Sequence, residues 1–169
     1  PLEVLQDPRV HLTTAQIAEQ SQTMRVITDR VNAIFRDAKR LNDVRDQVKA
    51  IVAHAGDLPD SADVSSGGKR LAARLDSLSI ELVQPQHTNG QDIIGFPNGV
   101  VDDWLYLAGN IDGSYMPVTG GDKQRLADLE QQWLPVQSRI DTLLGADVTA
   151  FNTKLGGKAI VIVPKVRVP

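Results

Sequence analysis

The feature that most constrains the fold is a stripe of apolar residues at helical spacing along residues 17–55. Its members are Ile17, Met24, Ile27, Val31, Ile34, Ala38, Leu41, Val48, Val52 and Ala55, with breaks at Gln20 and Arg45. Spacings of three, four and seven place these side chains on one face of an α-helix. A helix over residues 14–55 spans roughly 60 Å at 1.5 Å per residue. Because so long an apolar face needs partners, the sequence predicts a helical bundle.

Local signals define the ends of this helix. Thr13 and Gln16 have the spacing of a capping box, Gly56 suits a left-handed cap, and Pro59 prevents continuation. The charged residues off the stripe are spaced for i,i+3 and i,i+4 contacts and predict a solvated face. They are Arg25, Asp29, Arg30, Arg36, Asp37, Lys39, Arg40, Asp43, Asp46 and Lys49.

Three shorter helices are expected after it, separated by loops at residues 57–68 and 84–99 that are rich in turn-forming residues. The second helix ends before Pro85, the third begins near Pro97 and ends at Gly113, and Thr119 with Asp122 caps the fourth. Their apolar stripes are Leu71, Leu75, Leu78 and Leu82; then Val101, Trp104, Leu105, Ala108 and Ile111; then Leu126, Leu129, Trp133, Val136, Ile140 and Leu143.

The fourth helix is the predicted antiparallel partner of the first. Pro135 lies inside it and lacks the N–H that would bond to Gln131, so we expect a kink or local break there. Beyond Leu144 the apolar phase shifts, and the helix either continues past Gly145 or breaks into a short fifth helix. Gly156 and Gly157 then end it.

The two ends of the chain suggest extended structure. Residues 1–8 resemble a short strand that stops at Pro8, and no initiator Met precedes them, which indicates a piece of a longer polypeptide. The β-branched run at residues 159–163 favours a strand that either pairs with residues 2–5 or docks elsewhere. The predicted organisation is residues 1–12 as a preceding strand or linker, 13–157 as an all-α antiparallel bundle of about four helices, one near 40 residues, and 158–169 as an extended tail.

Composition excludes several functions. The net charge is -3, from 18 basic and 21 acidic side chains without a long single-sign run, so no nucleic-acid partner is expected. The absence of cysteine excludes disulfides and thiolate metal sites. The longest uncharged apolar run is far below the roughly 20 residues of a membrane-spanning helix, so no membrane insertion is expected.

No residue pattern predicts a catalytic, cofactor or metal site. His11, His54 and His87 lack helical metal-ligand spacing, and we expect them to be exposed or at helix ends. The carboxylates of Asp57, Asp60 and Asp63 do not follow a calcium-loop pattern. Residues 67–69, Gly-Gly-Lys, lack the other positions of a phosphate loop. Asp102 and Asp103 suit the start of a helix. Trp104 and Trp133 are expected in the core, whereas Tyr106 and Tyr115 suit an exposed contact with a partner.

Two segments resemble the C-terminal part of a bacterial family of secreted β-propeller proteins, described as glycosidase-like or sortilin-type with neuraminidase-type repeats. One is the joint Pro1-Leu2-Glu3-Val4-Leu5-Gln6-Asp7-Pro8-Arg9-Val10, and the other is Leu143-Leu144-Gly145-Ala146-Asp147-Val148-Thr149-Ala150-Phe151-Asn152. Residues 16–48, which include Asn32-Ala33-Ile34, are also similar. In that family a helical region follows the propeller and a small β-sandwich-like segment.

The resemblance implies a non-catalytic accessory domain that packs on an upstream propeller or on a second copy, in the periplasm or outside the cell. Any hydrolase site would lie on the propeller, upstream of Pro1. Two other hypotheses remain open: an independent coiled-coil interaction module that dimerises through the first helix, and a small helical enzyme that uses Asp102, Asp103 or His87.

Overall fold

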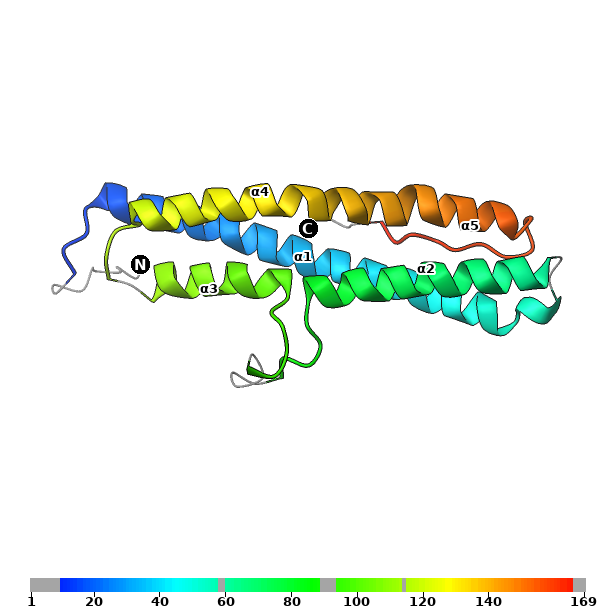
Figure 1. Ribbon diagram of the computed structural model, residues 1–169. Helices are drawn as coiled ribbons and strands as arrows, with labels where there is room; N and C mark the ends of the chain where they lie inside the picture. Colours follow the sequence, from blue (N-terminus) through cyan, green and yellow to red (C-terminus); the bar gives the residue numbers. More distant parts are fainter. Residues whose placement is uncertain (1–9, 58–59, 89–93, 114, 166–169) are drawn as a thin grey trace, which may run out of the picture.

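A computed structural model describes residues 10–57, 60–88, 94–113 and 115–165, which form an elongated all-α bundle (Figure 1). The helices are α1 (Thr14–Ala53), α2 (Ser61–Leu82), α3 (Val100–Asp112), α4 (Gly120–Thr142) and α5 (Val148–Lys154), with a π-helical turn at Leu143–Asp147. The all-α class and the helix of 40 residues are confirmed. No helix in the described part of the chain is both long and apolar enough to cross a membrane.

The predicted direction of the fourth helix is wrong. Helices α2 and α3 lie end to end and together form the antiparallel partner of α1, so α4 starts where α1 starts and runs parallel to it (Figure 1). Two ion pairs show this direction. Glu19 of α1 pairs with Lys123 of α4, and Arg30, farther along α1, pairs with Glu130, farther along α4. Each of α2 and α3 is too short to cover α1 alone, which is why the sequence favours the fourth helix as the antiparallel partner.

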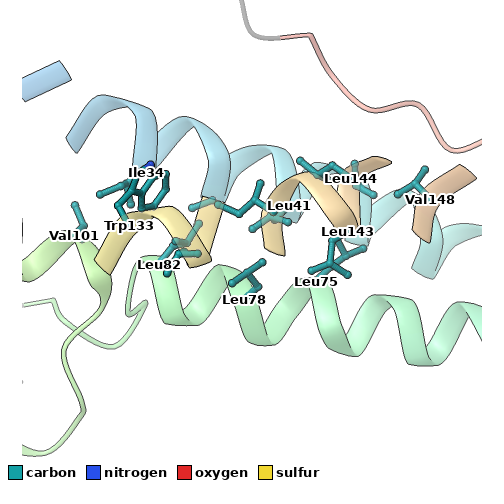
Figure 2. Packing of buried hydrophobic residues seen from close by; sticks show 14 of the residues in the cluster. Ile34, Leu41, Leu75, Leu78, Leu82, Val101, Trp133, Leu143, Leu144 and Val148 are labelled. Carbon is teal, nitrogen blue, oxygen red and sulfur yellow. The ribbon is translucent and has the colours of Figure 1, made fainter. Parts of the chain in front are cut away.

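The apolar stripes form one continuous core along the bundle. Figure 2 shows Ile34 and Leu41 of α1 beside Trp133 and Leu143, with Leu75, Leu78 and Leu82 of α2 opposite them. On α1 the break at Arg45 is bridged by Val44, which is fully buried. Ile17, in contrast, is 38% exposed, so the first turns of the predicted stripe lie outside the core.

The start of α1 is as predicted, and its end is not. The Thr13 hydroxyl accepts a bond from the backbone N–H of Gln16, whose side chain accepts one from the N–H of Thr13. However, α1 ends at Ala53 with His54 as its C-cap, and residues 55–57 form a 3-10 turn in which Gly56 is not left-handed. The left-handed residue is Asp60 (φ 54°), the N-cap of α2.

The predicted loop at residues 57–68 is wrong from Ser61 onward, because α2 begins there and contains both Gly67 and Gly68. Gly68 is needed for close packing and not for a turn. A Cβ at Gly68 would lie 2.3 Å from Cγ2 of Val52 and 3.1 Å from Cζ of Phe151, whereas one at Gly67 meets nothing closer than 3.9 Å. The glycine therefore lets α2 approach α1 and α5.

Adjacent glycines give a matched pair of substitutions. Gly67→Ala is expected to stabilise the fold by about 1 kcal/mol, because alanine favours a helix over glycine by that amount. Gly68→Ala has the same propensity gain, but overpacking against Val52 and Phe151 reverses it, with a net loss of about 1 kcal/mol. Urea unfolding of both variants and the unmodified chain measures the two signs. Equal effects at both positions would contradict the packing role of Gly68.

The helix that contains Pro135 is not broken at that residue. α4 continues through it, and the irregularity lies downstream in the π-helical turn Leu143–Asp147, after which α5 continues along the bundle (Figure 1). A π-helical turn accommodates an extra residue, which explains the phase shift seen in the sequence after Leu144. As predicted, Gly156 (φ 56°) and Gly157 (φ 77°) follow the last helix.

The C-terminal tail turns back at these glycines and runs along the bundle (Figure 1). Residues 159–165 are extended, but no β-strand is present in the described part of the chain, so the predicted β-like tail pairs with no other strand. Residues 1–9, including the predicted strand, lie outside the described residues. The tail instead contacts α1 and α5 through side-chain hydrogen bonds.

Candidate functional site

One partly buried polar cluster surrounds Arg30 in the middle of α1. Its guanidinium carbon lies 5.8 Å from the centroid of the Trp104 ring and 5.4 Å from that of the Trp133 ring. Its Nη2 also donates to Oε2 of Glu130 at 2.7 Å. Both tryptophans are 1% exposed, which confirms their predicted place in the core. Arg30 thus joins α1 to α3 and α4 by a cation–π contact with each ring and an ion pair.

The prediction that Arg30 belongs to a solvated face is wrong, since only 25% of its side chain is exposed. The sequence contained a usable signal: Arg30 lies three residues after Ile27 and four before Ile34, both fully buried, so it shares their face. Its partners are more than seventy residues away along the chain and carry no local signal. Within the described residues, Nε of Arg30 and Nε1 of Trp133 are buried without a hydrogen-bond partner. The cluster acts as a joint between three helices through its cation–π contacts and its ion pair.

A second polar cluster joins His87 and Phe96 to the start of α3. Nδ1 of His87 lies 3.1 Å from Oδ2 of Asp102, and Nε2 of His87 lies 3.3 Å from the carbonyl oxygen of Phe96. The same Asp102 oxygen accepts the backbone N–H of Gly99 at 2.7 Å, at the first turn of α3. The prediction that His87 is exposed or at a helix end is wrong, because only 11% of its side chain is accessible.

In this arrangement, the three residues of the enzyme hypothesis, His87, Asp102 and Asp103, all contact other groups of the protein. His87 and Asp102 come together, but both ring nitrogens of His87 face acceptors within the protein. Asp103 pairs with Arg125 of α4 at 2.9 Å. These contacts involve both ring nitrogens of His87 and one carboxylate oxygen each of Asp102 and Asp103, the atoms that would carry a proton in acid–base chemistry. The cluster fixes the connection between α2 and α3.

The remaining sequence candidates are dispersed. His11 is exposed, and Nδ1 of His54 lies 2.9 Å from the carbonyl oxygen of Ala50 at the end of α1. The Gly-Gly-Lys at residues 67–69 is inside α2, where it forms no phosphate loop. Asp63 is also in α2. Within the described ranges, no three His, Asp or Glu side chains are grouped to hold a metal ion.

Ion pairs between different elements brace the bundle along its length. Among the described residues there are seven: Glu19–Lys123, Arg30–Glu130, Arg45–Asp76, Asp63–Lys154, Arg74–Asp147, Glu81–Arg139 and Asp103–Arg125. The hydrogen bond from Lys154 lowers the pKa of the Asp63 carboxyl, and the hydrogen bonds to Glu81 raise the pKa of Arg139. Apart from Arg30–Glu130, each pair has at least one well-exposed side chain and is worth little alone, but together the pairs fix the register of the helices.

A shallow surface groove lies between α1 and α2. It has a volume of about 530 Å³, and its lining includes Phe35 and Ile80, which are 44% and 40% exposed. Asp76 and Arg45, which pair at 2.6 Å, form its polar side. The groove offers apolar surface and a charged rim, which are features of a contact surface and not of an enclosed reaction site.

Comparison with known proteins leaves these features to be interpreted from geometry. No family model, no curated protein and no solved structure matches this chain. The class that the structure itself defines is an all-α bundle with cross-braced helices.

Proposed function

We propose that this chain is a non-catalytic helical scaffold domain of a larger protein. The observation that carries the proposal is the use of its polar residues: the Arg30 and His87 clusters and seven ion pairs in the described part of the chain all join one element to another. A single apolar core runs the length of the bundle. Such construction favours a stiff spacer, roughly 60 Å long at α1, over a reaction site.

The finer proposal is an accessory domain that follows the propeller of a secreted β-propeller protein, in the periplasm or outside the cell. Its support is the similarity of residues 1–10 and 143–152 to that family. The second segment consists of residues with structural tasks: Asp147 pairs with Arg74, Phe151 packs in the core, and Asn152 binds the tail. The partner would be the upstream propeller or a second copy.

The reading frame that encodes this chain tests the finer proposal. We expect codons for a β-propeller and a signal peptide upstream of Pro1. A frame that starts with its own Met directly before Pro1 would contradict the accessory role. It would leave the scaffold proposal to be judged on the isolated bundle.

A self-associating coiled-coil module is the alternative. Most of the apolar stripe of α1 is covered by the chain's own helices, and the groove with Phe35 and Ile80 is the feature that we test as a contact through α1. Sedimentation velocity over a hundredfold concentration range, on the unmodified chain and on Phe35→Ser, separates the two. The scaffold proposal predicts that Phe35→Ser leaves the association state of the chain unchanged; a dimer that Phe35→Ser dissociates would favour the coiled-coil module.

A further inference from the structure

The C-terminal tail is held on α1 and α5 through its main chain. The N–H of Val161 donates to Oδ1 of Asn152 at 2.7 Å, and Nδ2 of Asn152 donates to the Val161 carbonyl at 2.9 Å. The N–H of Ile162 donates to Oε1 of Gln47 at 2.9 Å, and Nε2 of Gln47 donates to the Ile162 carbonyl at 2.9 Å. Each carboxamide therefore accepts one hydrogen bond from a tail residue's N–H and donates one to the carbonyl of the same residue, as a residue in a neighbouring β-strand does.

The side chains of the tail alternate as they do in a bound β-strand. Val161 is 3% exposed, and Ala159 and Val163 pack against the core, whereas Ile160 and Ile162 are 66% and 63% exposed. The backbone groups of Val161 face α5, and those of Ile162 face α1. Main-chain bonds combined with sites for alternate side chains are the means by which proteins recognise extended peptides.

The residues that bind the tail lie on helices that pack into the core through other side chains. Near Gln47, Val48 of α1 is fully buried, and near Asn152, Phe151 of α5 is 4% exposed. A third contact comes from Arg40 of α1, whose Nε donates to the carbonyl of Pro164 at 3.2 Å. The binding groups are therefore placed by the bundle, and the tail is added to them after the turn at residues 156–157.

We propose that α1 and α5 form a binding site for an extended peptide, and that residues 159–164 of the same chain are its resident ligand. Gln47 and Asn152 bind the main chain whatever the sequence. The inward positions select small or β-branched apolar side chains, and the outward positions are free to vary. The short connection keeps the local concentration of the tail in the millimolar range, so a modest intrinsic affinity keeps the site occupied.

Two full-length variants with the same added charge test the proposal. Val161→Asp places a carboxylate at a buried position and should release the tail, whereas Ile162→Asp places it in solvent and should leave the tail bound. The probe is a fluorescent peptide with the sequence of residues 158–165. We expect Val161→Asp to bind it at least about tenfold more tightly than Ile162→Asp, because only a vacant site is competent.

Specificity is tested with the peptide and the site. In the Val161→Asp chain, the additional change Asn152→Leu should abolish binding of the probe. A probe that carries aspartate at the position of Ile162 should still bind, and one that carries it at the position of Val161 should not. Equal binding by the Val161→Asp and Ile162→Asp chains, with unchanged circular dichroism, would overturn the proposal.

Hydrogen exchange provides a second measurement that does not depend on the charged variants. In the unmodified chain the amides of Val161 and Ile162 should be protected, and Asn152→Ala should accelerate their exchange about tenfold or more. The amides of α1 and α5 should keep their protection, since the helices do not depend on the tail. If the helix amides accelerate together with the tail amides, the tail is part of the cooperative core and the proposal fails.

Discussion

Replacing Ile34 with aspartate is expected to unfold the bundle. Ile34 is 0% exposed and packs beside Trp133 where α1 meets α4 (Figure 2). Arg30, four residues earlier on the same face, is already paired with Glu130, and a buried charge without a partner of its own costs several kcal/mol. A domain of this size has a total stability of roughly 5 to 15 kcal/mol. The expected result is a melting temperature lowered by about 10 °C or more, measured by circular dichroism at 222 nm.

The neighbouring residue supplies the control. Phe35 is 44% exposed, so Phe35→Asp adds the same charge one position along α1 without burying it. We expect this variant to melt within a few degrees of the unmodified chain. Leu129→Asp, in the facing part of α4, should behave like Ile34→Asp because Leu129 is 3% exposed. A cooperative melt of Ile34→Asp at the unmodified temperature would show that the α1–α4 contact is wrong.

Features encoded within a few residues were predictable from the sequence. The capping boxes at Thr13 and Thr119 are present, because a cap depends on side chains three residues apart. The apolar stripes gave most of the core for the same reason. The double glycine that was predicted to end the last helix follows α5, and both of its residues are left-handed. These signals located the starts of α1 and α4 and most of the faces that the helices bury.

Features that depend on contacts between distant segments were not predictable in this way. The direction of α4 follows from the stacking of α2 on α3, and no periodicity within either helix specifies that arrangement. Gly68 was assigned to a loop because glycine favours turns, whereas its role is the close approach of Val52 and Phe151. Tertiary packing here outweighed the local propensity of residues 61–68.

The polar clusters show the same division. The spacing along α1 indicates that Arg30 lies on the buried face. It does not indicate its two aromatic partners, which belong to α3 and α4. For His87, a loop position suggested exposure, and the contact with Asp102 spans fifteen residues through a connection with no regular pattern. In the tail, the β-branched run predicted a strand, and none is present in the described residues. Its partners proved to be the side chains of Gln47 and Asn152, which no strand pattern reveals.

Replacing Pro135 with alanine is expected to stabilise the protein by about 2 kcal/mol. Pro135 is exposed within α4, so its removal opens no cavity in the core. Proline inside a helix costs about 3 kcal/mol through the missing N–H and the clash with the preceding turn. The greater freedom of the unfolded chain offsets up to about 1 kcal/mol of the gain. Urea unfolding should show a higher midpoint with an unchanged slope.

Pro135→Gly separates the backbone effect from simple helix propensity. Glycine restores the same N–H but favours a helix less than alanine by about 1 kcal/mol. It should therefore still stabilise the chain, by about 1 kcal/mol less than alanine does. If neither substitution raises the midpoint, α4 does not regain the bond to Gln131. In that case the strain of the proline is relieved elsewhere along the helix, and the π-helical turn at Leu143–Asp147 is the place to measure a change in hydrogen exchange.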